Sequence, residues 1–169
     1  EWNVTVCSGA SQKALGAPPG LAPVAIAPDA WAVAEARRNV PRSLYLDLKY
    51  WRDVTLERAS WHPHPTTMAV STVVALHESL REIHEEGLAT RYQRHADAAA
   101  HLRAGLTDMG FSMFAAPGSE SPAVTLALTP DGIDSIALKD YLLREHDIMI
   151  AFAPDHLREQ AIRVGHMGV

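Results

Sequence analysis

The chain has 169 residues, of which 47% are hydrophobic and 21% are charged, and its formal net charge is −5. This composition is typical of a folded globular protein and excludes a disordered or fibrous chain. The negative charge and the lack of any Lys/Arg cluster argue against nucleic acid or an anionic membrane as the main partner.

Cysteine content and chain ends give further expectations. Cys7 is the only cysteine, so no disulfide can form within the chain. The apolar runs are shorter than the roughly 20 residues that a membrane-spanning helix needs, and no signal-peptide pattern precedes them. These features predict a cytoplasmic protein. The chain opens on Glu1 and ends on a glycine-rich apolar stretch, which predicts a fragment of a longer protein with an incomplete site.

The start of the chain predicts two strands. An alternating, β-rich run covers residues 2–6, and a short apolar run bounded by prolines covers 21–27. The second run lacks polar alternation, which is typical of a strand buried on both faces. We expect the two strands to be neighbours in the centre of a sheet, with Cys7 buried.

Short helices and an irregular loop come next. Asp29 can cap a helix over 30–38, and a second helix is predicted over 44–52. Prolines at alternate positions exclude both helix and inner strand from 61–65.

The second half has a clearer pattern. Apolar residues spaced four and three apart predict a helix from about residue 69 to a stop at Gly87, and another over 88–109. Val124, Leu126 and Leu128 share one face of a predicted strand. Asp131 or Asp134 then caps a helix that runs to about residue 145, and strands are predicted over 148–151 and 161–164. The alternation of helices and strands indicates an α/β or α+β class, with Gly87 as the natural boundary.

Lys13 is the first candidate for chemistry. It follows the first predicted strand by a Gly/Ser turn, and the stiff run Pro18-Pro19-Gly20 comes a few residues later. This order would hold an amine at the C-terminal edge of a sheet, where open α/β folds bind ligands. A buried lysine loses its proton readily and condenses with aldehydes. The alternative is a surface lysine beside a proline-rich turn.

A family resemblance rests on several segments. The run Ser-Gln-Lys-Ala-Leu-Gly-Ala-Pro-Pro-Gly at 11–20 resembles the cofactor-lysine segment of class V aminotransferases, which bind pyridoxal 5′-phosphate. Within that family it is most similar to alanine–glyoxylate and serine–pyruvate aminotransferases. Other segments match in the same order, at 43–49, 76–80, 86–88 and 161–165. The resemblance implies a fold-type I transferase of α/β class. Residues 1–86 would end the large cofactor-binding domain, and residues 87–169 would form a smaller, truncated α+β domain.

The resemblance also implies roles for single residues. Lys13 would bind the cofactor covalently and move the substrate α-proton, Gln12 would contact the cofactor phosphate, and Arg163 would bind the substrate α-carboxylate. Without the resemblance, Gln12 is a solvated turn amide and Arg163 an edge-strand arginine facing water. A lone charge in a short apolar strand is costly to bury unpaired, which independently favours a functional role for Arg163.

The loop before the long helix is a second predicted cofactor contact. Thr67 matches a threonine that reaches the phosphate of the neighbouring subunit's cofactor, and His64 stands where relatives usually carry a tyrosine for that phosphate. A hydroxyl near a helix N-terminus suits a phosphate, although Thr67 could serve only as an N-cap. His62 and His64 also raise the possibility of a metal site, but no further ligand stands at a recognised spacing, so we expect no metal.

The implied activity is transfer of an amino group from a small amino acid, alanine or serine, to a small 2-oxo acid, glyoxylate or pyruvate. The implied assembly is a homodimer with shared sites. The family's aspartate for the pyridine nitrogen and its stacking aromatic ring would lie upstream of this chain. Two alternatives stay open. One is a catalytically incomplete fragment or non-enzymatic remnant. The other is a lyase or desulfurase of the same fold, for which Cys7 in a buried strand is a poor nucleophile.

Overall fold

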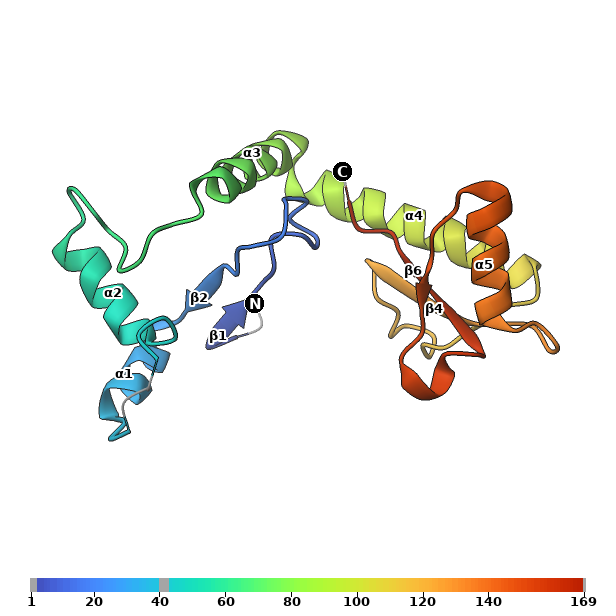
Figure 1. The fold of residues 1–169 in the computed structure, drawn as a ribbon, viewed down its shortest axis with the longest axis horizontal. Coiled ribbons are helices and arrows are strands. Elements are labelled where there is room, and N and C mark those ends of the chain that lie inside the picture. Colours follow the sequence, from blue (N-terminus) through green and yellow to red (C-terminus); the bar gives the residue numbers. More distant parts are fainter. Residues whose placement is uncertain (1–2, 40–42, 169) are drawn as a thin grey trace. The chain divides into compact units, whose positions relative to one another are not determined.

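The computed structural model describes residues 3–39 and 43–168. The chain divides into two units, one ending at Leu80 and the other beginning at Arg81 (Figure 1). Among the helices of the described residues, none combines the length and the apolar character that a membrane crossing requires.

The first unit begins with two short antiparallel strands. β1 (Val6–Ser8) pairs with β2 (Val24–Ile26), and Val6 stands opposite Ile26. The predicted pairing is confirmed, but the predicted central and buried position is wrong. The strands form a two-stranded sheet in which Val6 is 51% exposed and Cys7 is also exposed. Burial on both faces needs a layer above and below the sheet, and the described part of this unit supplies neither.

Two helices follow, each with a boundary that differs from the expectation. α1 (Pro28–Ala36) starts before Asp29, because the fixed φ of a proline suits the first helical position. Asp29 therefore lies inside the first turn, and its carboxylate accepts from the Ala30 amide at 3.0 Å. α2 (Leu48–Glu57) starts later than predicted, because Asp47 is its N-cap. The Asp47 carboxylate accepts from the amides of Lys49 and Tyr50.

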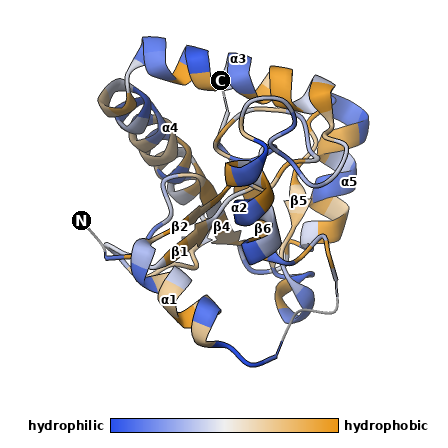
Figure 2. Cartoon of the chain, turned by 90° about the vertical axis from the view of Figure 1, so that its left-hand side faces the viewer, coloured by the Kyte–Doolittle hydropathy of each residue, from blue (hydrophilic) through white to orange (hydrophobic). Residues whose placement is uncertain are grey.

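The two long helices are confirmed. α3 (Val70–Glu86) ends before Gly87, whose φ of +81° is readily accessible to glycine, and α4 (Leu88–Asp108) follows directly. Figure 2 shows hydrophilic and hydrophobic residues alternating along α3, as expected of an amphipathic helix. Residues 61–69 before α3 contain neither helix nor strand, which confirms the predicted loop.

The second unit contains a four-stranded antiparallel sheet in the order β3-β4-β6-β5. The elements in chain order are β3 (Ser112–Met113), β4 (Val124–Leu128), α5 (Ser135–His146), β5 (Ala151–Phe152), a 3-10 turn η1 (Asp155–Leu157) and β6 (Ala161–Gly165). α4 packs on β3 and β4, and α5 packs on β5 and β6. The predicted strand over 148–151 starts later, because Asp147 adopts a left-handed cap and the Ile148 amide donates to the Leu142 carbonyl.

The core of this unit lies between the sheet and its two helices. Leu106 of α4 packs with Ala127 of β4 and Ile162 of β6, and apolar side chains surround them: Leu102, Phe111, Met113, Leu138, Ile150 and Val164. Thr125 and Ala127 are therefore the buried residues of β4, and the predicted face of Val124, Leu126 and Leu128 is half-buried on the other side. Asp134 caps α5 by accepting from two backbone amides, which decides between the two predicted caps.

Candidate functional site

Lys13 lies in two consecutive turns directly after β1. Its amide donates to the Ala10 carbonyl at 3.2 Å, and its carbonyl accepts from the Gly16 amide at 2.9 Å. Gly16 has a φ of +72°, a conformation open to glycine and strained for most other residues. The side chains of Lys13 and Gln12 are both exposed. The lysine is therefore on a fixed backbone turn with its side chain exposed, as in the surface alternative, and the argument from a buried lysine does not apply.

Ser11 closes the base of this loop. It is fully buried, and its hydroxyl donates to the Pro18 carbonyl at 2.6 Å and accepts from the Leu21 amide at 3.3 Å. Its own amide donates to the Leu21 carbonyl at 3.1 Å, and its carbonyl accepts from the Ala17 amide at 2.9 Å. Sequence reasoning missed this residue, because a serine in a Gly/Ser turn is usually solvated.

The end of the lysine loop packs against the start of α3. A Cβ at Gly20, whose φ is +130°, would lie 3.6 Å from Cγ2 of Thr72. Thr72 is in the first turn of α3, which directly follows the loop that carries His64 and Thr67. Within the first unit, the lysine loop therefore contacts the helix that follows the second predicted contact segment.

His64 is held by its own loop. Its half-buried ring places Nδ1 at 2.9 Å from the Thr66 carbonyl oxygen. Because a carbonyl only accepts, Nδ1 carries the proton in this contact, and Nε2 accepts hydrogen bonds in the neutral ring. The ring packs against that of His62, with centroids 4.3 Å apart and ring planes inclined at 53°. In the described structure, Nδ1 of His62 is buried with no hydrogen-bond partner.

Thr67 lies before α3 and is exposed. α3 begins three residues later, at Val70, and the Ala69 carbonyl accepts from the Val73 amide. The alternative role of Thr67 as an N-cap is therefore excluded. Among the described residues, none forms a hydrogen bond with its hydroxyl.

Arg163 stands on β6, in the second unit. It pairs with Leu126 of β4 on one side and Ala151 of β5 on the other, so it is not on an edge strand, although it faces water as that alternative predicted. Its neighbours Ile162 and Val164 pack toward the helices, and the arginine itself is exposed. The argument from the cost of burying a lone charge therefore does not apply. Arg163 also lines a pocket of about 350 Å³ beside Lys139 and the end of β5.

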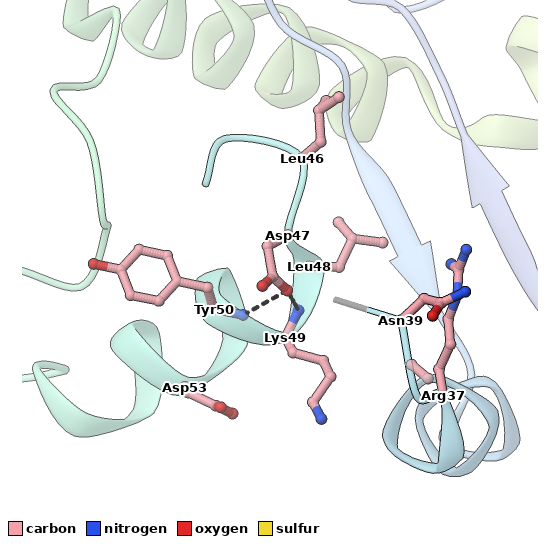
Figure 3. A pocket seen from close by; sticks show the side chains of 9 residues that line it. Arg37, Asn39, Leu46, Asp47, Leu48, Lys49, Tyr50 and Asp53 are labelled. Carbon is pink, nitrogen blue, oxygen red and sulfur yellow. Dashed lines mark hydrogen bonds between the residues drawn. The ribbon is translucent and has the colours of Figure 1, made fainter. Parts of the chain in front are cut away.

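A second pocket, of about 340 Å³, lies between α1 and α2 (Figure 3). None of the predicted site residues lines it. Figure 3 shows that its Asp47 carboxylate accepts from the amides of Lys49 and Tyr50, at 3.0 and 3.2 Å. This carboxylate is used to cap α2.

The segment after β6 is tied to α4 by polar groups that sequence reasoning missed. The Arg94 guanidinium donates to Glu86 and to the Gly168 carbonyl, and buried Arg91 also donates to Glu86. Hydrogen bonds from Arg94, and then from Arg91, lower the pKa of Glu86 to about 2 against the opposing effect of desolvation. Burial, followed by the charge of Arg103, lowers the pKa of His166 below its ordinary value.

Among the described residues, no group of three or more His, Cys, Asp or Glu side chains is arranged to hold a metal ion. The stacked pair His62 and His64 therefore gains no further ligand from this part of the chain.

The chain is similar in sequence to known aminotransferases. No family model matches the chain. An uncharacterised aminotransferase of Methanocaldococcus jannaschii is 34% identical over all of this chain and 43% of its own length. A protein named soluble hydrogenase, small subunit, of Synechococcus sp. is 36% identical over 99% of this chain and 42% of its own length.

Solved structures point to one group. An alanine–glyoxylate aminotransferase of Nostoc sp. matches with a TM-score of 0.88 and 32% identity over 99% of this chain and 44% of its own. The ureidoglycine–glyoxylate aminotransferase of Bacillus subtilis matches with a TM-score of 0.87 and 35% identity over 99% of this chain and 43% of its own. The chain is homologous to part of an aminotransferase.

This aminotransferase-like chain confirms the predicted fold class. Its mixed helix and sheet elements follow the C-terminal part of fold-type I aminotransferases. The chain spans less than half the length of the relatives described above, at 43% and 42%. The predicted domain division and the roles of Lys13, Gln12, His64, Thr67 and Arg163 stay predictions.

Proposed function

We propose that the full protein containing this segment is a pyridoxal-phosphate-dependent aminotransferase. It would move an amino group from a small amino acid, alanine or serine, to a small 2-oxo acid such as glyoxylate or pyruvate. The observation that carries the proposal is Lys13, an accessible amine on a doubly hydrogen-bonded turn, in a chain homologous to an alanine–glyoxylate aminotransferase. The segment by itself is expected to be inactive.

The residues present fit the cofactor. Lys13 offers an exposed amine for an aldehyde, and Gln12 beside it offers an exposed amide for a phosphate oxygen. Thr67 offers an exposed hydroxyl that can donate to phosphate, and His64 can donate through Nε2 when its imidazole is protonated, because Nδ1 is used by the Thr66 carbonyl. When bound, pyridoxal phosphate supplies the electron sink that makes the α-proton of an amino acid removable.

The chain's own residues would then divide the work. Lys13 Nζ would take the proton from the substrate Cα and deliver it to the C4′ carbon of the cofactor, so its position decides where the proton moves. Arg163 holds the α-carboxylate through two parallel hydrogen bonds, a geometry that a lysine cannot reproduce. Gln12 fixes the phosphate end of the cofactor.

We also propose a homodimer in which His64 and Thr67 contact the cofactor phosphate of the partner subunit. Proline on both sides of His64 limits how far this loop can fold back, and the positive end of α3 follows directly. An anion presented by a second copy would satisfy the free hydroxyl of Thr67. Dissociation of the dimer would then release cofactor.

Absorption spectroscopy tests the proposal. The full-length protein loaded with pyridoxal phosphate is expected to show a visible absorption band, and Lys13→Ala is expected to abolish it. Lys49→Ala, which removes a lysine of α2, is the matched control and should keep the band. A Lys13→Ala protein with an unchanged band would overturn the role of Lys13.

A lyase or desulfurase activity is the second candidate, because Cys7 is exposed rather than buried. Burial no longer argues against this thiol, although it lies within β1 and not on a loop. Product analysis separates the two activities. An aminotransferase consumes the amino acid only when a 2-oxo acid is present, whereas turnover without any acceptor would favour the lyase.

A further inference from the structure

We propose that Ser11 is a positioning residue for Lys13, and that its buried hydroxyl holds closed the loop that carries the lysine amine. This inference rests on the proposed role of Lys13. It names a residue two positions earlier that contacts neither cofactor nor substrate and acts through the backbone.

The hydrogen bonds of Ser11 all run to the far side of the loop. The hydroxyl bonds to Pro18 and Leu21, at 2.6 and 3.3 Å, and the backbone bonds to Ala17 and Leu21, at 2.9 and 3.1 Å. A hydroxyl is needed because it donates to one group and accepts from another at the same time. The side chain is 0% exposed, so water cannot replace it without opening the loop.

Side-chain burial along this loop is small. The side chains of Gln12, Lys13 and Ala14 are exposed, Leu15 is half-buried, and Ala17 is buried. A single methyl group buries little apolar surface, so the closed state depends largely on the hydrogen bonds at the base of the loop. The turn from Lys13 to Gly16 lies inside the span that Ser11 closes, and the turn from Ala10 to Lys13 begins one residue before it.

The position of the backbone matters to the lysine because its amine sits on a flexible four-carbon stem. A fixed turn limits the region that Nζ can reach, and small displacements of a reacting group lower rates strongly. Removing the Ser11 hydroxyl should therefore change how Lys13 works without changing which groups bind the substrate.

Limited proteolysis of the cofactor-free full-length protein tests loop closure without using activity. Trypsin can cut after Lys13 only when the loop opens, and at low protease the rate follows the open population. Ser11→Ala is expected to raise cleavage after Lys13 by about ten- to a hundredfold, because both hydrogen bonds of the hydroxyl are lost. Cleavage after Arg144 of α5 is the internal reference for global unfolding and should not change.

Three variants serve as controls. Ser8→Ala removes an exposed serine of β1 outside the loop and should behave as the wild type. Ser11→Thr keeps the hydroxyl and should restore slow cleavage. If Ser11→Ala does not fold, Ser11→Cys takes its place, since a thiol of similar size is a weaker donor and acceptor and should give an intermediate cleavage rate.

The loaded enzyme distinguishes positioning from mere stability. Ser11→Ala is expected to lower kcat by about tenfold with KM within about twofold, and to shift the pH midpoint of the visible absorption band. Unchanged cleavage after Lys13 would overturn the closure of the loop by Ser11. Faster cleavage with unchanged kcat and an unchanged band would overturn positioning. Failure of the proposed function is separate, because it would show as an unchanged band in Lys13→Ala.

Discussion

The backbone amide of Gly168 donates to Nε2 of His95 at 3.3 Å, which joins residues 73 positions apart. The other ring nitrogen of His95 lies 2.8 Å from the Arg91 carbonyl oxygen, so the buried imidazole links α4 to the segment after β6. Arg94 adds donors to the Gly168 carbonyl, and Glu86 holds Arg94. The chain just beyond Arg163 is therefore fixed by a polar cluster formed by the end of α3 and the first turns of α4.

Glu86 makes this cluster sensitive to acid. Its pKa in the folded state, about 2, is below its ordinary value of 4.5, so its contribution to stability is fully present above about pH 4.5. That contribution is lost as the pH falls from about 4.5 to about 2. Urea unfolding of the full-length protein at a series of pH values should show a drop in midpoint over this range. Glu86→Gln should lower the midpoint at neutral pH and flatten the drop, and Glu82→Gln, on the same helix, should not. An equal acid slope in Glu86→Gln would contradict this assignment.

The cap of α5 can be tested by a matched pair of aspartates. Asp134 accepts from the amides of Ile136 and Ala137, whereas Asp131 lies in the preceding turn. Asp134→Ala is expected to lower the free energy of unfolding by about 1 kcal/mol, and Asp131→Ala by much less. Thermal or urea unfolding measures both. Equal effects of the two substitutions would mean that Asp134 is not the cap that matters.

Arg163 is predicted to act on the substrate and not on the cofactor. Arg163→Ala should raise KM for the amino acid by about 10- to 100-fold, which corresponds to the loss of a charge-assisted hydrogen-bonded pair. Arg163→Lys should recover little of this loss, because it cannot form the two parallel bonds. Arg158→Ala removes a nearby arginine that stacks on Phe152 and is the control. A loss of cofactor from Arg163→Ala with an unchanged KM would exclude the role as carboxylate site.

Thr67 is predicted to serve the partner subunit. Thr67→Ala should weaken cofactor retention by about tenfold, the size expected for one hydrogen bond to a charged group, and leave the Lys13 band unchanged. Mixing Lys13→Ala protein with Thr67→Ala protein is the sharper measurement. If sites are shared, each heterodimer has one site with both defects and one with neither, so activity should reappear where each variant alone is nearly inactive. Subunit exchange without recovery would place Thr67 in its own subunit's site.

Local pattern was enough to predict the long helices and the cap of α5. Apolar residues spaced three and four apart predict α3 and α4. Gly87 ends α3 through its own backbone conformation, and Asp134 caps α5 by accepting from amides two and three residues later, so both effects are local. The lysine segment at 11–20 was recognised from sequence for a similar reason. Its turns are formed by hydrogen bonds between residues three positions apart, so a short stretch of sequence is enough to indicate them.

Only the tertiary structure decided which side chains are buried and on which face of a sheet each one lies. Cys7 and Val6 look like buried strand residues in sequence but are exposed, because burial depends on which layers cover a sheet. Arg163 looks like a costly buried charge, but the pleat of β6 turns it to the face opposite Ile162. Ser11 looks solvated and is fully buried. Contacts such as Ser11 with Leu21, or His95 with Gly168, join residues whose separation no local pattern records, and only the folded chain brings them together.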